Sequence, residues 1–371
     1  MSNNISLSRF IRNDDTQLRL FDMGRRVSKI RVSDFEKFEL GEVAYPFPYQ
    51  QTAWVGILFW NVKNKEQHNL WFIRMPLDER GYINVASRDE FMDMLLSRIA
   101  EQITSKHAVD TDIEKENDLT HALKDNPYVF KPTEENMAVF HAKAKQILGL
   151  SPSAFLSDTI NYLSLLDGEN KDKWQHLGVQ GFADIAVRQD NIEINKIITN
   201  AISGLPQEPY CALCNALENE NCTPEIMNEI VLVLRDLINK KRKQDESLDD
   251  THIITKIVSS MRAIASVSSN QFLSKTITEV LESQYGKEPA VLVMIAAKLW
   301  EVLDEQGVLK CYLEMLAQNP KGQTLFNALI SDQMFMPGKR QKILSIFRDQ
   351  DRSETLSIAV GGFFQHMGNV K

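Results

Sequence analysis

From residue 134 onward the sequence repeats one pattern, an amphipathic segment of about 12–20 residues followed by a break of Gly, Pro, Ser, Thr or Asn-Asp. Taken in pairs, the expected helices start at intervals of 33 to 45 residues, which is typical of two-helix HEAT or armadillo repeats. No strict consensus recurs, so an irregular helical domain is the alternative. The expected helices are 134–149, 152–166, 171–189, 191–203, 206–219, 224–243, 251–268, 270–284, 288–304, 306–318, 321–332, 338–349 and 353–366.

The first 110 residues have strand-like patterns instead. "LRLFDMG" (18–24) and "RRVSKIRV" (25–32) are expected to form two strands. "TAWVGILFWN" (52–61) is almost continuously apolar and predicts a strand buried on both faces. "LWFIRM" (70–75) is the expected return strand of a hairpin, after a polar loop. Ser33 is expected to cap a short helix that follows.

These patterns divide the chain into three parts. Residues 1–110 are predicted to form an α+β head with a small antiparallel sheet, and residues 111–133 a polar linker. Residues 134–371 are predicted to form a mainly α-helical, HEAT/armadillo-like repeat domain.

Four carboxylates lie close together in the sequence of the head: Asp78, Glu79, Asp89 and Glu90. One interpretation is an oxygen-rich site for Mg²⁺. The other is structural, since Ser87 and Glu90 have the S-x-x-E spacing of a capping box before an apolar helix. In that case the acidic residues occupy a turn and the first turn of a helix, where negative charge is favourable.

The string "WQHLGVQGFADIAVR" (174–188) is the most distinctive of the helical region. If it is one helix, its polar side chains form a stripe that is either a binding groove or a hydrogen-bonded seam between helices. Gly178 and Gly181 would then let a neighbouring helix approach closely. The candidate interaction residues are Trp174, Gln175, His176, Gln180 and Asp184.

The charge balance limits the partners. The chain has 50 acidic against 42 basic residues, and this excess disfavours general nucleic-acid binding, which needs many cations. A basic concave face on the helical array would be needed for it. Arg25 and Arg26 belong to a local excess of basic residues that could dock an acidic partner. "KKRK" (240–243) is expected to be a solvated helix end.

The four cysteines, Cys211, Cys214, Cys222 and Cys311, are expected to be free thiols in a reducing compartment. "CALC" (211–214) has no histidine nearby to complete a zinc site, so core positions on a helix are expected. No nucleotide-binding or hydrolase motif occurs, and no cofactor is expected. No apolar run reaches the length of a membrane span, and no secretory signal is recognisable, so a cytoplasmic location without membrane association is expected.

Several strings together resemble an uncharacterised bacterial family, mainly of gammaproteobacteria, that is marked by a Leu-Asp-Glu motif. They are "PLDE" (76–79), Gly81, "RDEF" (88–91), "LFDMGRR" (20–26) and "WQHLGVQG" (174–181). No activity is established for the family, so the resemblance implies a bacterial cytoplasmic setting and nothing about chemistry.

The sequence favours a non-enzymatic interaction or scaffold protein that binds another protein through the surface of a helical-repeat array. The alternative is a metal-dependent hydrolase of phosphate esters built on the carboxylate cluster of the head. That alternative requires all four carboxylates to converge on one point.

Overall fold

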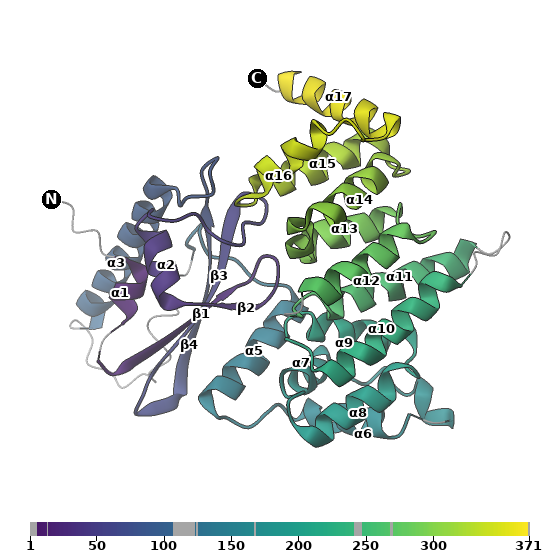
Figure 1. Cartoon of the computed structure of the whole chain (residues 1–371). Coiled ribbons are helices and arrows are strands. Elements are labelled where there is room, and N and C mark those ends of the chain that lie inside the picture. The colour runs from purple at the N-terminus through teal and green to yellow at the C-terminus, as the bar shows by residue number, and fades with distance from the viewer. Residues whose placement is uncertain are drawn as a thin grey trace. The chain divides into compact units, whose positions relative to one another are not determined.

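A computed structural model of the chain describes residues 6–12, 14–106, 123, 125–166, 168–240, 247–267 and 270–369. The chain divides into two compact units. Unit 1 comprises Met1–Asn136 with Phe335–Pro337, and unit 2 comprises Met137–Met334 with Gly338–Lys371. Unit 1 contains a small sheet with helices, and the described residues of unit 2 form helices without a sheet (Figure 1).

The sheet of unit 1 has four antiparallel strands in the order β2-β1-β3-β4. They are β1 (Thr16–Asp22), β2 (Ser28–Ile30), β3 (Thr52–Asn61) and β4 (Asn64–Pro76). The predicted antiparallel sheet is therefore confirmed, with both expected N-terminal strands and the hairpin in place.

The hairpin has a shorter turn than the sequence predicts. β4 already begins at Asn64, and the polar residues expected in a loop continue the ladder, with Trp60 opposite His68 and Phe59 opposite Asn69. Residues 64–69 of β4 are exposed or half-buried, so no apolar alternation indicates this part of the strand. Backbone hydrogen bonds to β3 are enough to extend it.

Three helices cover one face of this sheet: α1 (Leu7–Ile11), α2 (Val32–Glu39) and α3 (Val85–Lys106) (Figure 1). Alternate residues of β3 point to this face because strand side chains alternate. Trp71 of β4 packs edge-on against Phe59 with ring centroids 4.9 Å apart. The shared core includes Leu7, Ile11, Phe35, Phe38, Ala53, Val55, Ile57, Phe59, Phe91 and Leu95.

Both predicted helix caps in unit 1 are wrong. The N-cap of α2 is Arg31, whose carbonyl accepts from Phe35 N at 3.0 Å, and Ser33 lies inside the first turn. At the start of α3, Asn84 Oδ1 accepts from Ser87 N at 3.1 Å. Asn84 lies three positions before Ser87 and is of a residue type that caps helices well. Ser87 is therefore already part of α3, and it forms no capping box with Glu90.

Part of the expected linker 111–133 packs on unit 1, and residues 111–122 and 124 lie outside the described residues. Arg74 N donates to Tyr128 O at 2.7 Å, and Phe130 N donates to Phe72 O at 3.1 Å. Leu123 is buried in the core of unit 1. Residues 128–130 thus pair with the edge of β4.

From Glu134 on, every predicted helical segment contains a helix of the structure, and the described residues there include no strand. Thr223 and Pro224 start one helix as predicted, with Pro at its first position. The helices are α5 (Glu134–Leu148), α6 (Phe155–Ser164), η1 (Gly168–Asp172), α7 (Val179–Val187), α8 (Ile192–Ile202), α9 (Gln207–Leu217), α10 (Pro224–Asn239), α11 (Ser247–Ala263), α12 (Asn270–Glu282), α13 (Pro289–Lys298), η2 (Trp300–Asp304), α14 (Gln306–Ala317), α15 (Gly322–Phe335), α16 (Lys339–Phe347) and α17 (Glu354–Asn369).

A buried carboxylate at the end of α2 holds the N-terminus of α1. Leu7 N donates to Glu39 Oε1 at 2.9 Å, Ser8 N donates to Oε2 at 3.2 Å, and the Ser8 hydroxyl also donates to Oε2. Glu39 is only 3% exposed. Burial raises the pKa of Glu39 to about 7, although the hydrogen bonds from Ser8 and Leu7 lower it in part.

Glu39 therefore predicts a pH-dependent stability of unit 1. The folded chain keeps a proton on Glu39 between pH 4.5 and about 7, where the unfolded chain has lost it. The stability from this group is complete below pH 4.5 and is lost as the pH rises through about 7. As the pH rises from 4.5 to 8, we expect the unfolding free energy of Glu39→Gln to rise by about 3 kcal/mol relative to that of the wild type. Urea unfolding at each pH measures this change.

The matched control is Glu42→Gln, because Glu42 is exposed in the same unit. Its unfolding free energy should follow the wild type at every pH within a few tenths of a kcal/mol. A Glu39→Gln difference that does not change with pH would contradict the proposed titration.

Candidate functional site

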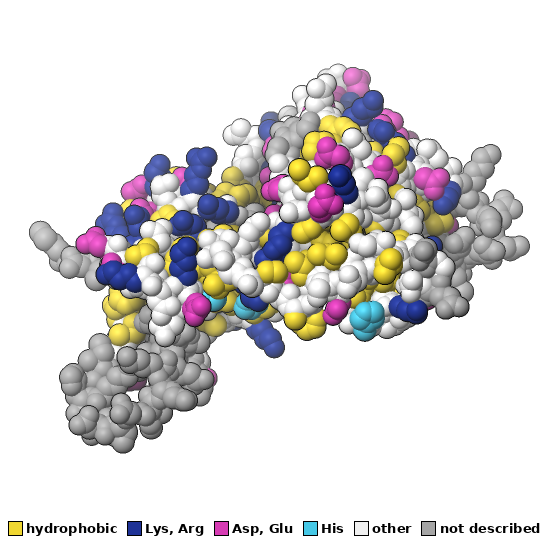
Figure 2. Space-filling view, turned by 90° about the horizontal axis from the view of Figure 1, so that it is seen from below, with side chains coloured by type: hydrophobic (Ala, Val, Ile, Leu, Met, Phe, Trp, Pro, Cys, Tyr) yellow, Lys and Arg dark blue, Asp and Glu magenta, His cyan; other side chains and the backbone are white. Residues whose placement is uncertain are grey.

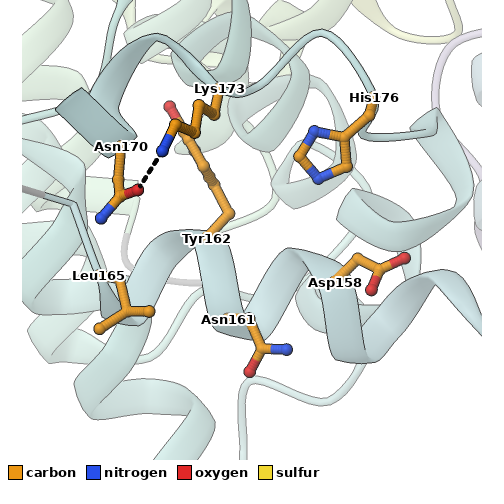
Figure 3. A pocket seen from close by; sticks show the side chains of 7 residues that line it. All are labelled: Asp158, Asn161, Tyr162, Leu165, Asn170, Lys173 and His176. Carbon is orange, nitrogen blue, oxygen red and sulfur yellow. Dashed lines mark hydrogen bonds between the residues drawn. The ribbon is translucent and has the colours of Figure 1, made fainter.

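A pocket of about 250 Å³ lies in unit 2 between α6 and the segment that leads into α7. Figure 3 shows side chains from both segments facing it. They come from α6 and its C-cap, from η1, and from the turn that follows η1. The lining residues are Asp158, Asn161, Tyr162, Leu165, Asn170, Lys173 and His176.

Hydrogen bonds fix two sides of this pocket. Tyr162 donates through its hydroxyl to Lys171 O at 2.9 Å, which ties α6 to η1. Lys173 Nζ donates to Asn170 Oδ1 at 3.0 Å. Burial and the nearby Asp172 carboxylate raise the pKa of Tyr162, so the phenol stays protonated and remains a donor.

Close packing of α6 on α7 places the pocket walls. A Cβ on Gly181 would lie 2.7 Å from Phe155 O and would also collide with the Thr159 hydroxyl. Only glycine permits this approach, so the predicted close contact at Gly181 is confirmed. Gly178 is the N-cap of α7 and lies against the Phe155 ring.

Two titratable side chains of the pocket are not engaged by the protein. Asp158 and His176 are exposed, and neither side chain makes a hydrogen bond or ion pair with a described residue. They come from α6 and from the turn before α7, and both line the pocket (Figure 3). Polar groups that converge on a concave surface without internal partners are available to a ligand.

The predicted polar stripe on a single helix is wrong. Trp174, Gln175 and His176 lie in a turn after η1, since α7 begins only at Val179. Leu177 N donates to Trp174 O at 2.9 Å and closes this turn. The extended backbone of Gly178, with φ −83° and ψ 150°, separates it from the helix. His176 therefore lines the pocket, whereas Gln175 is exposed and Trp174 is half-buried.

The remaining two candidates, Gln180 and Asp184, form a seam inside unit 2. Asp184 is fully buried and accepts from Ser153 N at 3.1 Å and from Arg188 Nη1 at 2.8 Å. Gln180 donates to Ala138 O at 3.2 Å and to Asp184 Oδ2 at 3.5 Å. Of the two interpretations in the sequence, the structural seam is the one that fits these two residues.

Arg25 and Arg26 are buried in unit 1, so they cannot form the docking patch that the sequence suggested. Arg25 Nε donates to Pro48 O at 2.8 Å, and both backbone N–H groups lie within 3.4 Å of Asp22 Oδ2. Burial raises the pKa of Asp22 to about 6. The Tyr45 hydroxyl donates to the same carboxylate at 2.8 Å. These arginines therefore belong to the polar interior of unit 1.

The four carboxylates of the head do not share a site. Asp78 accepts from Arg80 N and Tyr82 N, each at 2.9 Å, and so closes a turn. Asp89 pairs with Arg88 at 2.6 Å, and Glu90 accepts from Tyr128 Oη at 2.7 Å. Among the described residues no three His, Cys, Asp or Glu side chains could hold one metal ion. The convergence that the hydrolase alternative requires is therefore missing from the described part of the chain.

The cysteines are free thiols, as predicted. Cys214 on α9 is buried, which confirms its expected place in the core, and Cys222 is buried as well. Burial raises the pKa of the Cys222 thiol to about 12, so it stays protonated and unreactive. Cys211 and Cys311 are only half-buried.

No basic stripe is visible on the helical unit in Figure 2. The described Lys and Arg side chains on this face alternate with acidic and apolar ones. Lys240 caps α10, while residues 241–243 of the "KKRK" string lie outside the described residues. This face gives no support for nucleic-acid binding.

Six of the seven pocket residues were not identified from the sequence. One signal was present in the predicted helix 152–166, where Phe155, Asp158, Asn161 and Leu165 recur at helical spacing opposite the buried row. Two of them, Phe155 and Leu165, are large apolar side chains exposed by 50% and 58%. A helix with an apolar residue on its solvent side is a candidate contact surface.

Within the described residues, no helix is long and apolar enough to cross a membrane. No curated protein and no solved structure matches the chain. One family model matches residues 3–364, nearly the whole chain, and it is described as "Protein of unknown function (DUF3549)". This match confirms the uncharacterised family that the sequence motifs indicate, and the chain belongs to the DUF3549 family.

Proposed function

We propose that this protein is a non-enzymatic interaction protein whose helical unit is a HEAT-like repeat array. The partner is a protein that binds at the pocket between α6 and the turn before α7. The observation that carries the proposal is how the helices pack along the chain. In a two-layer array, each helix contacts the next helix but one, since helices of the same layer stack.

The helix contacts support this arrangement in one layer. α7 packs on α9, α9 on α11, and α11 on α13. The other layer follows the same rule, since α6 packs on α8 and α8 packs on α10. Short connections place consecutive helices antiparallel between the layers. Arrays of this kind expose a long surface, and binding is their usual role.

Polar links between helices join residues whose separation in the sequence matches the spacing of the predicted repeats. Arg235 Nε donates to Glu279 Oε2 at 2.8 Å, across 44 positions of the sequence. Lys310 Nζ donates to Asp349 Oδ2 at 2.7 Å, across 39 positions. These separations fall within the interval between successive predicted repeats, so the links connect neighbouring repeats.

The pocket on α6 is the site that we assign to the partner. Leu165 is one of its lining residues, and Phe155 is a second exposed apolar side chain on the same helix. Asp158 and His176 supply polar groups that no described residue engages. A concave centre with apolar side chains around it is how interfaces exclude water from their strongest contacts.

The test is capture of partners from the source cell with Leu165→Asp as bait. We expect this variant to lose at least about tenfold of a specific partner, because a charge at the rim cannot be desolvated. The control is Leu232→Asp, since Leu232 on α10 is also 58% exposed. It should keep the partner, and both variants should unfold at the wild-type temperature.

Two outcomes would reject the site. The partner could survive in both variants, or it could be lost equally from both. A partner that every pocket variant keeps, with His176→Ala and Asn161→Ala included, rejects the pocket alone. The proposal of an interaction protein fails if the wild type captures no specific partner.

A further inference from the structure

We propose that the pocket between α6 and the turn before α7 receives an arginine side chain of the partner, and this inference rests on the proposed function. It follows from three features of the pocket. They are an unengaged carboxylate, a fixed aromatic wall with an apolar rim, and amide groups that suit a peptide main chain. Each can be traced to a residue that the fold holds in place.

The carboxylate is Asp158, on the side of α6 that faces the pocket (Figure 3). It makes no ion pair with a described residue, so its charge is available to a cation. A guanidinium group can donate two parallel hydrogen bonds to one carboxylate. An ammonium group offers no such fork, and its stronger hydration raises the cost of entering a concave site.

The aromatic wall is the ring of Tyr162, which is 6% exposed. Its hydroxyl donates a hydrogen bond to Lys171 O, which fixes the ring in place. Leu165, at the C-cap of α6, also lines the pocket. The methylene stem of arginine packs against apolar surface of this kind. The pocket therefore combines the counter-ion with the surfaces that such a side chain needs.

The amide groups are those of Asn161 and Asn170, with the Lys173 ammonium bound to Asn170 at 3.0 Å. Figure 3 shows Lys173 and Asn170 on the side of the pocket away from Asp158. A partner residue with its guanidinium at Asp158 would present its main-chain carbonyl toward Lys173. This cation therefore favours a single arginine followed by carbonyl groups and disfavours a run of basic residues.

The size of the pocket agrees with one side chain and its main chain. Sites for whole small ligands usually have volumes of about 300–1,000 Å³. This pocket has about 250 Å³, and Leu165, one of its lining residues, is 58% exposed. A small pocket with apolar neighbours is the form of an anchor point in a protein interface.

The test uses two small probes on the full chain, N-acetyl-arginine amide and N-acetyl-citrulline amide. They have nearly the same shape, but only the first carries a charge. With methyl-labelled leucine, the NMR signal of Leu165 should shift and saturate at about millimolar arginine probe. We expect binding of the citrulline probe to be at least about tenfold weaker, since it offers no ion pair.

Asp158→Asn should weaken the arginine probe by at least about tenfold. The control is Asp190→Asn, because Asp190 is an exposed aspartate of the same unit outside the pocket, and it should leave binding unchanged. Equal binding of both probes, an unaffected Leu165 signal, or full binding by Asp158→Asn would each overturn the inference. If Leu165→Asp still loses a partner while the arginine probe fails, the arginine is wrong and the interaction site stands.

Discussion

Replacing Gly181 by alanine is expected to lower the free energy of unfolding of unit 2 by about 2 to 3 kcal/mol. The added methyl group would collide with the Thr159 hydroxyl and would lie 2.7 Å from Phe155 O. The second atom belongs to the backbone of α6, so a side-chain rotation cannot relieve the clash. Either α6 must move away from α7 or the helix must distort, and both changes reduce packing.

Urea unfolding followed by circular dichroism measures this loss, and Gly361→Ala is the matched control. Gly361 lies inside α17, and a Cβ there would meet no atom within 4 Å. Alanine should therefore stabilise the helix by about 0.5–1 kcal/mol. Because α6 carries four lining residues of the pocket or its rim, Gly181→Ala should also weaken partner capture. Equal effects of the two substitutions on stability would contradict the close contact.

The helices of unit 2 could be predicted because their signals are local. Each expected segment has an apolar face at helical spacing and a break at its ends, and Pro224 after Thr223 is one example. Long, strongly periodic segments depend little on the rest of the fold. The same holds for β3, whose nearly continuous apolar run reflects burial on both sides.

The candidate site was harder to predict than the helices, because its geometry depends on one short break in a predicted helix. His176, Gln180 and Asp184 follow one another at intervals of one helical turn, so the sequence predicts a single helix over 171–189. In the structure the residues up to Gly178 form η1 and a turn. This turn brings His176 toward Asp158 of α6, and no pattern within either segment indicates that they meet.

Local sequence patterns also failed to predict which charged residues are buried. The sequence suggests that Arg25 and Arg26 form a basic surface patch. In the structure both are buried in unit 1, and their backbone N–H groups donate to the carboxylate of Asp22. Charged residues are rarely buried without partners. Here Asp22 of β1 accepts from the Tyr45 hydroxyl, and Arg25 donates to Pro48 O. Only the tertiary fold brings these groups together.

The second large effect is expected at Glu218, which caps α9 and is 1% exposed. Lys298 on α13 lies 2.6 Å from its Oε1, and Arg262 on α11 donates to its Oε2. One carboxylate thus joins α9, α11 and α13. Glu218→Ala removes the buried carboxylate that Arg262 and Lys298 share, which should cost about 3–5 kcal/mol of unfolding free energy.

The control is Glu279→Ala, because Glu279 pairs with Arg235 at 2.8 Å near the surface, with side chains 30% and 40% exposed. Solvent screens that pair, so its loss should cost less than about 1 kcal/mol. Urea unfolding of both variants gives the comparison. A second variant, Glu218→Leu with Lys298→Met, should regain part of the loss, since it also removes one of the two cations that Glu218 binds. If Glu218→Ala costs no more than Glu279→Ala, the buried network does not hold these three helices together.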